Sequence, residues 1–268
     1  MTFGSIVAIP DPLALGFHTR VLLGFNVRSG KADVVADYLR SLRNIQGIRL
    51  TTGRYDIFTY GVFRNSQELI GFIEGELSHV PELTGIEQIM ILEIVKHSWM
   101  YLRGDTDAYA EAIPCDLDEW DLRLIQELEM HPRASITDLE KGLGMSRKPI
   151  TKKLQTLMNN NIIRVCSVID PLAFGFGVEA GILVRVEPGK IRSTASTLTI
   201  DKRVNHVAII TGSFALFFIA IFHDLAELSD FLRNDLGNIP GVISHETIVY
   251  VARMKESFAL ISSQDASK

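Results

Sequence analysis

Asp11-Pro12-Leu13-Ala14-Leu15-Gly16-Phe17 occurs twice in this chain, returning 159 residues later as Asp170-Pro171-Leu172-Ala173-Phe174-Gly175-Phe176. When this offset is held without a gap over residues 11–81, 20 of 71 positions are identical, whereas about 4 are expected for unrelated sequences of ordinary composition. A segment at roughly 116–162 lies between the two copies and has no counterpart before the first copy. The chain is therefore organised as module, insert, module.

Length and composition are those of an ordinary globular protein with room for two or three domains, at 268 residues, 47% hydrophobic and 22% charged. No run of about 18 apolar residues is present, which is the length that a transmembrane helix needs. The start Met1–Gly4 lacks the basic and apolar stretches of a signal peptide. Cys115 and Cys166 fit no metal-ligand spacing and suit a reducing compartment. We therefore expect a cytoplasmic protein that does not contact a membrane.

Charge is distributed unevenly along the chain, although the net charge is only −5. Residues 104–119 include six acidic residues and no basic one, whereas residues 146–164 include five basic residues and no acidic one. The net charge argues against a general nucleic-acid coat but is compatible with a local basic surface that binds DNA. The most concentrated positive charge lies in the insert.

Each copy of the repeat shows the same predicted order of elements. In copy one, strands are predicted at 21–27, 47–52, 57–63 and 86–95, and helices at 31–44 and 66–77, with Ser66 as the cap of the second helix. In copy two, strands are predicted at 180–186, 204–211, 214–222 and 242–252, and helices near 190–200 and at 225–236. The order βαββαβ predicts a ferredoxin-like fold with two helices on one face of an antiparallel sheet, so the fold class is α+β.

One predicted strand, Phe214–Phe222, is apolar at every position. A strand in a sheet with helices on one face and water on the other should alternate between apolar and polar residues. Both faces of this strand must therefore be buried, one by its own helices and the other by a second sheet. We expect the two copies of one chain to pack sheet against sheet.

The insert carries the start and stop signals of three short helices. Asp118 can cap the first helix, and Ser135 and Asp138 can form a capping box for the second. Gly144 then allows a tight turn, and Ser146 can cap a third helix. Helix, helix, tight turn, helix predicts a helix-turn-helix, whose third helix would enter the major groove of DNA.

The third helix supplies the residues that we expect to contact DNA: Ser146, Arg147, Lys148, Thr151, Lys152, Lys153 and Gln155. Lys152 and Lys153 are expected to contact phosphates, whereas Arg147 and Gln155 are better candidates for contacts with bases. Basic residues on one side of a helix are also common on an ordinary solvated face. The tight turn and the complete lack of acidic residues favour the DNA-binding interpretation.

The insert reads Leu117-Asp118-x-x-Asp121-x-x-Leu124-Ile125-x-x-Leu128, then Leu143-Gly144-Met145-Ser146, then Ile162-Ile163-Arg164, and Asp-Pro-x-x-x-Gly-Phe follows. In this order of motifs the chain resembles the Lrp/AsnC (feast/famine) transcription regulators over nearly its whole length. In that family the ferredoxin-like module, called RAM, binds an effector and mediates oligomerisation. The resemblance implies a regulator rather than an enzyme, without a cofactor. Its expected partners are double-stranded DNA, a small-molecule effector such as an amino acid, and further copies of the chain in a homo-oligomer.

The same resemblance indicates where an effector would bind. The family's loop pattern Thr-Gly-x-Tyr-Asp appears as Thr52–Asp56, where Arg54 and Asp56 would meet carboxylate and ammonium groups. Copy two replaces Tyr-Asp with Phe214-Ala215, but it keeps Thr247, a hydroxyl at a position that resembles the family's effector contact. At the corresponding position we expect copy one to offer only apolar residues, such as Met90 and Ile91. The expected effector-binding residues are Thr52, Gly53, Arg54, Tyr55, Asp56, Gly212 and Thr247, with one site per chain or fewer.

We expect five segments: a first RAM-like domain at 1–100, an acidic linker at 101–116, the helix-turn-helix at 117–165, a second RAM-like domain at 166–256 and a flexible tail at 257–268. In the family, a helix-turn-helix precedes the RAM domain, whereas copy one begins directly at the strand that leads into RAM. Because Thr2–Pro10 aligns with the exit from the insert near Ile162, we expect that a helix-turn-helix once preceded this strand.

Two alternatives remain open. Glu140 and Gly142 stand where the family has a small residue and a helix former, which favours a partner subunit that binds ligand but not DNA. Siroheme decarboxylases resemble the family in fold and hold their tetrapyrrole with histidine, tyrosine and arginine. Residues 204–208 keep only His206 of that set. The seven histidines are scattered, and no catalytic or metal-binding motif is present.

Overall fold

The computed structural model describes residues 5–98, 112–113, 115–168 and 171–261. The chain divides into two compact units. The first unit contains residues 19–109 and 169–256, and the second contains residues 2–18, 110–168 and 257–268. No helix in the described part of the chain is long and apolar enough to cross a membrane.

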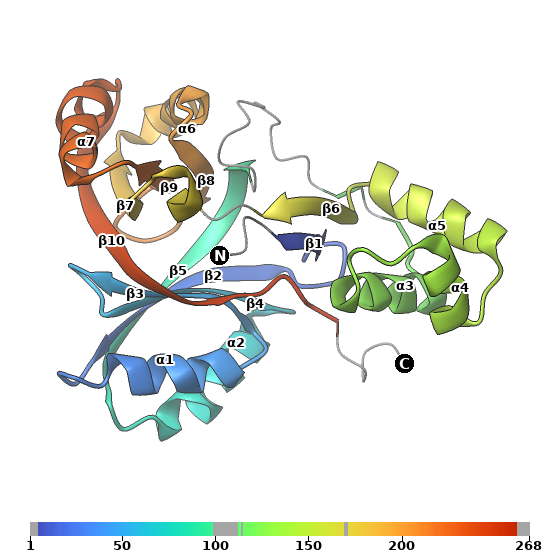
Figure 1. Cartoon of the computed structure of the whole chain (residues 1–268). Coiled ribbons are helices and arrows are strands. Elements are labelled where there is room, and N and C mark those ends of the chain that lie inside the picture. The colour runs from blue at the N-terminus through green and yellow to red at the C-terminus, as the bar shows by residue number, and fades with distance from the viewer. Residues whose placement is uncertain (1–4, 99–111, 114, 169–170, 262–268) are drawn as a thin grey trace. The chain divides into compact units, whose positions relative to one another are not determined.

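The first unit contains both copies of the repeat, and each copy has the predicted βαββαβ order (Figure 1). Copy one consists of β2 (Thr19–Val27), α1 (Ala32–Ser41), β3 (Ile45–Thr52), β4 (Ile57–Phe63), α2 (Ser66–Gly75) and β5 (Leu83–His97). Copy two consists of β7 (Val178–Val186), α6 (Ile191–Ile200), β8 (Val204–Ile210), β9 (Leu216–Phe222), α7 (Leu225–Asp230) and β10 (Val242–Glu256). The chain is therefore α+β, as predicted.

The cap of the helix after β4 lies one residue earlier than the predicted Ser66, and the helix after β9 is capped at the equivalent position. Asn65, rather than Ser66, accepts a hydrogen bond from the backbone N–H of Glu68 at 3.0 Å. Asp224 is the repeat-equivalent residue, and it accepts from the N–H of Glu227 at 2.8 Å. The same capping arrangement thus begins α2 and α7.

The strands of the two copies close into one barrel, in the order β10-β3-β4-β2-β5-β8-β9-β7. The last strand of each copy is 15 residues long and pairs with its own sheet first and with the other copy afterwards. Thus β10 pairs with β3 and β5 pairs with β8, both antiparallel. The expected pairing of the copies within one chain is confirmed, and the sheets are also joined at their edges by hydrogen bonds.

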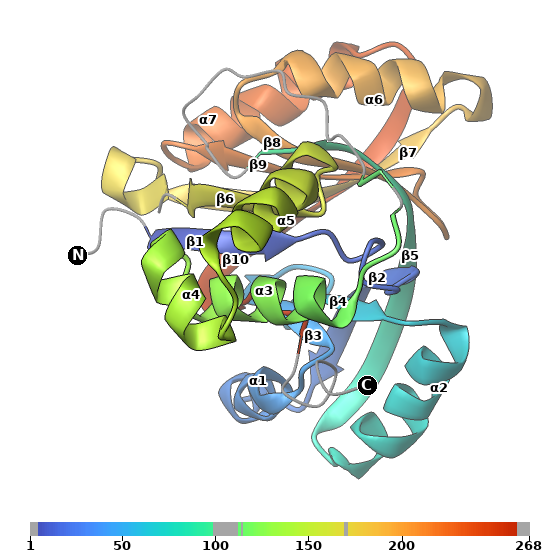
Figure 2. The same ribbon diagram turned by 90° about the vertical axis from the view of Figure 1, so that its right-hand side faces the viewer.

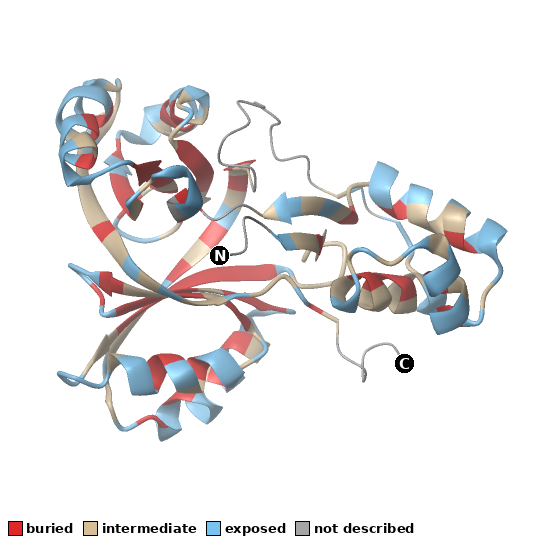
Figure 3. Ribbon diagram, in the orientation of Figure 1, coloured by how far each residue is buried: buried red, intermediate tan, exposed pale blue. Residues whose placement is uncertain are grey.

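Three apolar cores fill the first unit. One lies between α1, α2 and the sheet of copy one, and a second lies between α6, α7 and the sheet of copy two. The third lies inside the barrel and draws Leu22, Phe58 and Ile89 from copy one, and Leu183, Phe217 and Ile248 from copy two. On β9, Phe218 belongs to the helix-covered core and Phe217 to the barrel interior. The prediction that this strand is buried on both faces is confirmed, and Figure 3 shows in red the buried residues of the strands.

The second unit contains a helix-turn-helix and a two-stranded sheet (Figure 2). Its elements are β1 (Ser5–Pro10), α3 (Glu119–Met130), α4 (Ile136–Leu143), α5 (Arg147–Asn159) and β6 (Ile163–Val168). The strand β1 pairs antiparallel with β6, and the core of the unit includes Ala8 together with residues from all three helices. Residues 5–10 therefore belong with the insert and not with the first RAM-like domain, contrary to the expected boundary at residue 1. The strand β6 likewise runs across the expected boundary between residues 165 and 166, and the other expected boundaries remain predictions.

The signals read from the insert form the predicted local structures, with one exception. Asp118 with Asp121, and Ser135 with Asp138, each make a complete capping box. Gly144 ends α4 in the left-handed conformation, with φ 64°, and Asn161 adopts φ 56° after α5. Ser146 occupies the N-cap position of α5, but its side chain makes no capping hydrogen bond.

Candidate nucleic-acid interface and effector loops

The candidate DNA-binding surface is the exposed side of α5. Ile150 and Leu157 on the opposite side are buried at 0% and 1% exposure, and they anchor the helix to the core of the second unit. Helical spacing places Lys148, Lys152 and Gln155 away from this anchor, and all three are exposed. This exposed side, together with Arg147 in the first turn, is called the basic face of α5.

The basic face is free of acidic residues, because α5 contains none over its thirteen positions. Asn159 is also exposed and follows Gln155 by four residues, so it extends the same side by one turn. Asn159 is not among the residues expected to contact DNA, although its spacing from Lys148, Lys152 and Gln155 along the helix identifies it. Amide and cationic side chains along one exposed side of a helix can contact both base edges and phosphates.

Lys153 is not part of the basic face, although it was expected to contact DNA. Its Nζ lies 2.6 Å from Asp118 Oδ2 and 3.0 Å from Asp121 Oδ1, at the start of α3. The hydrogen bond from Lys153 holds the pKa of Asp118 below its ordinary value. Burial lowers the pKa of Lys153, but the two carboxylates outweigh burial, so the pKa of Lys153 is raised. Lys153 therefore ties α5 to α3 and is not available for a phosphate.

Two further expected residues have hydroxyl groups near the basic face. Thr151 is half-buried, and its Oγ1 donates a hydrogen bond to the backbone oxygen of Arg147 at 2.9 Å. Ser146 is exposed at the start of α5, where its side chain makes no capping bond. Ser146 can donate to a phosphate, whereas the Thr151 proton is already used within the helix.

The departures at Glu140 and Gly142 do not prevent the helices from packing. Leu139 and Leu143, on the same helix, are buried at 1% and 5% exposure. A Cβ added to Gly142 would lie 3.3 Å from Glu127 Oε2, so the glycine leaves room for the side chain of Glu127 from α3. The three helices therefore pack together as a helix-turn-helix despite Glu140 and Gly142.

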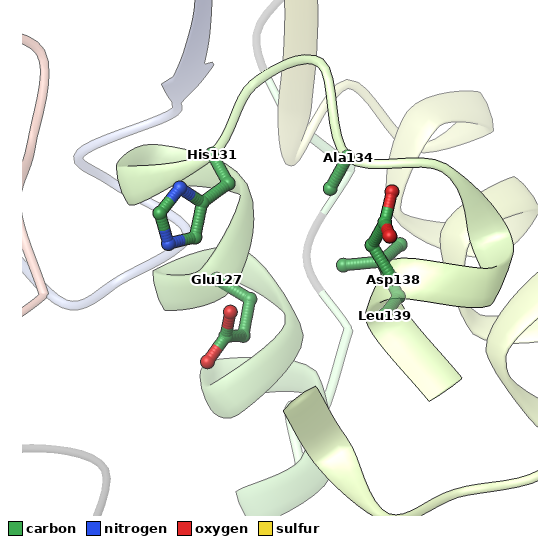
Figure 4. A pocket seen from close by; sticks show the side chains of 5 residues that line it. All are labelled: Glu127, His131, Ala134, Asp138 and Leu139. Atoms are coloured by element: carbon green, nitrogen blue, oxygen red, sulfur yellow. The ribbon is translucent and has the colours of Figure 1, made fainter. Parts of the chain in front are cut away.

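A shallow hollow lies beside α3 and α4 in this unit (Figure 4). It is lined by Glu127, His131, Ala134, Asp138 and Leu139. The side chain of Asp138 is already used in the capping box with Ser135. Two acidic residues in its wall make the hollow unsuited to a phosphate or a carboxylate, and it is separate from the basic face of α5.

In the first unit, Arg54 of the expected effector loop is surrounded by acidic groups. Its guanidinium lies 2.8 Å from Glu87 Oε2 and 2.9 Å from Glu246 Oε2. Glu87 and Glu246 are themselves repeat-equivalent residues, one from β5 and one from β10. The hydrogen bond to Glu87 is the main cause that raises the pKa of Arg54. A ligand carboxylate would have to replace one of these two partners.

Tyr55 is buried in the barrel core at 2% exposure. Its hydroxyl donates to Glu87 Oε2 at 2.7 Å and accepts from Arg54 Nε at 2.9 Å. Burial first, and Glu87 second, raise the pKa of Tyr55. The ring also lies against Gly24, where an added Cβ would approach it to 2.4 Å. Tyr55 therefore fixes the loop to the barrel.

Asp56 and Thr52 flank this anchored part of the loop and are exposed. Asp56 Oδ2 accepts a hydrogen bond from the backbone N–H of Val27 at 2.8 Å, so part of its role is to hold the turn. Gly53 adopts φ 106°, and a Cβ added there would lie 3.2 Å from the backbone oxygen of Thr247. The structure thus brings the loop of copy one next to β10 of copy two, and the Thr247 hydroxyl is buried without a partner among the described residues.

Copy two presents a different loop at the equivalent position. Gly212 keeps a positive φ of 102°, and Phe214, which replaces Tyr55, is buried at 4% exposure. The Phe214 ring lies 5.8 Å from the guanidinium of Arg54 and 5.1 Å from that of Arg185. The two loops therefore meet through Arg54 and Phe214, while Gly212 itself lies on the copy-two side.

The position in copy one that corresponds to Thr247 is not the expected Met90 or Ile91. Gln88 pairs with Leu23 on β2, and Thr247 pairs with Ile182 on β7. Leu23 and Ile182 are repeat-equivalent, so Gln88, and not Met90 or Ile91, corresponds to Thr247. Gln88 is exposed and polar. Counting the offset along β5 would have found it.

The structure also brings together two histidines that are far apart in the sequence. His97 Nδ1 and His206 Nδ1 lie 3.0 Å apart, at the paired positions of β5 and β8. The sequence suggests that His206 stands alone, but in the structure it lies beside His97. Within the described residues, no group of three or more histidine, cysteine or acidic side chains is placed to hold a metal ion.

Fused ferredoxin-like modules, together with a helix-turn-helix that has a basic third helix, define a DNA-binding protein with its own ligand-binding domains. The Lrp/AsnC ligand binding domain matches residues 20–100 and 179–260. A winged helix-turn-helix DNA-binding domain matches residues 117–164. The chain belongs to the Lrp/AsnC family of transcription regulators, and it contains the family's ligand-binding domain twice.

Curated relatives of this chain are regulators of half its length. An HTH-type transcriptional regulator from Pyrococcus furiosus is 32% identical over 146 residues, which are 54% of this chain and 99% of that protein. The HTH-type transcriptional regulator FL11 from Pyrococcus abyssi is 29% identical over 145 residues, 54% of this chain and 95% of that protein. These relatives correspond to one helix-turn-helix and one module each in length.

A solved structure covers nearly the whole chain. The siroheme decarboxylase NirDL superposes with a TM-score of 0.69 over 98% of this chain and 80% of its own, at 15% sequence identity. At this identity the likeness shows a shared fold and nothing about activity. The relatives found by sequence are named as regulators, so the decarboxylase alternative is not favoured.

Proposed function

We propose that this chain is a transcription regulator that binds double-stranded DNA through the basic face of α5 and responds to a small metabolite, with an amino acid as the expected class. The observation that carries the proposal is the exposed row Lys148, Lys152 and Gln155 on a packed helix-turn-helix without acidic residues on its third helix. The regulator names of the sequence relatives support a regulatory rather than a catalytic role. Such a protein would work in the cytoplasm.

The described residues include one such helix, so specific binding would use at least two chains. Two recognition helices on one side of the duplex are spaced by a whole helical turn of about 10 base pairs. We therefore propose a homo-oligomer, a dimer or larger, that binds paired half-sites. The alternative of a subunit that binds ligand but not DNA predicts no binding at all by the purified chain.

The experiment is a fluorescence anisotropy titration with the DNA upstream of the protein's own gene, repeated at several salt concentrations. Lys148→Ala combined with Lys152→Ala should weaken binding to all sequences and flatten the salt slope by about two units, because two phosphate contacts are lost. The matched control is Lys202→Ala, an exposed lysine of the first unit, and it should bind as wild type does. Unchanged affinity in the double variant would reject the basic face as the DNA contact.

The effector would bind at the junction between the loop of copy one and β10. Support comes from the approach of Gly53 to Thr247 and from the buried, unpartnered Thr247 hydroxyl. Glu87, Glu246 and Asp56 can hold an ammonium group, and Arg54 can exchange Glu246 for a ligand carboxylate. Copy two lacks the Tyr-Asp pair, so we propose one site per chain.

Calorimetry with a panel of amino acids tests this site. Asp56→Asn is the sharper variant than Asp56→Ala, because the amide oxygen can still accept from the Val27 N–H while the charge is removed. It should abolish the binding heat without unfolding the loop. Two equivalent sites per chain, or heat that is unchanged by Asp56→Asn, would contradict the proposal.

A further inference from the structure

Four charged residues of the first unit form a cluster with balanced charge. Arg253 Nη2 lies 3.3 Å from Glu179 Oε2, and Arg253 Nε lies 3.6 Å from Glu256 Oε2. Arg49 forms an ion pair with Glu256 and lies 3.9 Å from Glu179 Oε2. We call Arg49, Glu179, Arg253 and Glu256 the balanced cluster. Each cation in it lies within ion-pair distance of a carboxylate, so the charges of the cluster balance, although Arg49 Nε makes no hydrogen bond to a described residue.

The repeat-equivalent positions in the other half carry different side chains. Arg20 stands where copy two has Glu179, and His97 stands where copy two has Glu256. The registers agree with this equivalence, because Arg20 pairs with Val62 and Glu179 pairs with Ile221, which is 159 residues later. The two carboxylates of the balanced cluster are thus replaced by a guanidinium group and an imidazole ring.

The two arginines of the balanced cluster are replaced by smaller apolar residues in this half. Ala208 corresponds to Arg49, and Ile94 corresponds to Arg253. Both belong to the core inside the barrel. The two positive charges that Arg49 and Arg253 supply in the balanced cluster therefore have no counterpart at these positions.

Arg20 is buried at 4% exposure, and its Nη1 has no hydrogen-bond partner among the described residues. No ion pair between Arg20 and a described acidic residue is present. A buried guanidinium without a counter-ion is a costly arrangement, because desolvation of the charge is not offset. Its presence in a well-packed barrel is explained if an anion completes the site.

The neighbouring histidines cannot provide the missing negative charge. His206 is buried at 8% exposure and shares a hydrogen bond with His97, with 3.0 Å between the Nδ1 atoms. Burial, and then the nearby charge of Arg20, lower the pKa of His206 to about 4. His206 is therefore neutral at pH 7, when its ring can donate a hydrogen bond or accept one but cannot balance Arg20.

We propose that Arg20, His97 and His206 form a binding site for a small organic carboxylate, whose carboxylate group takes the part that Glu179 and Glu256 play in the balanced cluster. The site is distinct from the effector loop, because Arg20 lies at the start of β2 and Tyr55 packs on Gly24, four residues further along. Arg20 would bind the anion through charge-assisted hydrogen bonds, and the histidine pair would donate one more.

The experiment compares wild type with Arg20→Met in calorimetric titrations with succinate, with inorganic phosphate and with sodium chloride as the ionic-strength control. Arg253→Met is the matched variant, since it removes an arginine from the balanced cluster. We expect wild type and Arg253→Met to bind succinate, and Arg20→Met to bind it about tenfold to hundredfold more weakly, the range for loss of a charge-assisted hydrogen bond. Succinate heat that is equal in wild type and Arg20→Met, or absent from both, would overturn the proposal. Phosphate bound more tightly than succinate in an Arg20-dependent manner would overturn the carboxylate assignment.

A stability measurement separates this role from a purely structural one. Without carboxylate, Arg20→Met should unfold at the same urea concentration as wild type or at a higher one, because it removes an unpaired buried charge. Succinate should stabilise wild type and leave Arg20→Met unchanged. A variant that is unfolded or strongly destabilised without any carboxylate would show that Arg20 holds the barrel together, and the proposal would fall. As a second readout, NMR titration should show the pKa of His206 rising when succinate neutralises Arg20.

Discussion

Lys96 and Lys255 hold equivalent positions in the two copies, and each binds the end of a helix that belongs to the other copy. Lys96 Nζ donates to the backbone oxygens of Thr199 and Asp201 at 2.8 and 3.1 Å, at the C-terminal end of α6. Lys255 Nζ donates to the backbone oxygen of Leu42 at 2.9 Å, at the end of α1. Because carbonyl groups at a helix C-terminus carry partial negative charge, each lysine stabilises the fold of the copy opposite its own.

Lys96→Met should therefore lower the free energy of unfolding of the first unit by about 1–2 kcal/mol, through loss of hydrogen bonds from a charged donor. Lys255→Met should have an effect of the same sign. Urea denaturation measures both, with the exposed Lys202→Met as the control. If neither variant is less stable than the control, these contacts contribute nothing to the joining of the copies.

Gly24→Ala should destabilise the first unit by about 1–3 kcal/mol, the range for overpacking of a core. The added Cβ would lie 2.4 Å from Tyr55 Cε1, so the buried ring has to move. Gly71→Ala is the matched control, because an added Cβ there meets nothing within 4 Å and the site lies inside α2. That control should be neutral or more stable by up to about 1 kcal/mol. Thermal unfolding of the two variants would contradict this account if their order were reversed.

Lys152 and Lys153 are neighbours in sequence with opposite expected roles. Lys152→Ala should flatten the salt slope of DNA binding by about one unit and leave stability unchanged. Lys153→Ala should leave the salt slope unchanged and lower the stability of the second unit by about 0.5–1 kcal/mol, because the ion pairs with Asp118 and Asp121 are partly exposed. Anisotropy and denaturation on both variants test the pair together. Identical behaviour of the two would show that the contact of Lys153 with α3 is not maintained in solution.

His206 should make stability depend on pH below neutrality. Its pKa is lowered to about 4 in the folded chain, from an ordinary value of 6.5. Between these values the unfolded chain binds the proton more readily, so this contribution is complete above about pH 6.5 and is lost as the pH falls towards 4. The loss amounts to at most about 3 kcal/mol.

The measurement for His206 is urea denaturation at pH 7 and at pH 4.5. His206→Gln should lose less stability over this interval than wild type does. It should retain the part that comes from His245, whose pKa burial also lowers. The same loss in both proteins would mean that protonation of His206 does not oppose folding.

The parts of the fold that were predictable are those in which short segments carry their own signals. The capping residues Asp118 and Ser135, and the turn residue Gly144, act over a few neighbouring positions, so their roles could be read from the sequence. The doubly apolar strand Leu216–Phe222 required a second sheet and thereby indicated that the copies pair.

The parts that were not predictable depend on contacts between distant residues. Nothing near Lys153 in sequence indicates that its Nζ binds Asp118, and His97 meets His206 across 109 positions. The edge joins of β3 with β10 and of β5 with β8 depend on how far the last strand of each copy extends. The apolar pattern in the sequence predicts that these strands end at residues 95 and 252, whereas they continue to His97 and Glu256.

The barrel, closed by strands of two copies that share one backbone, has a consequence for how this protein can evolve. In an assembly of two identical subunits, every substitution appears twice and must suit both halves. Here arginine stands at position 20 in one half only, and the equivalent Glu179 of the other half is kept. The barrel also closes within one molecule, so its closure does not depend on protein concentration. The two halves of the fused chain can therefore diverge in sequence separately, and their pairing needs no association between separate molecules.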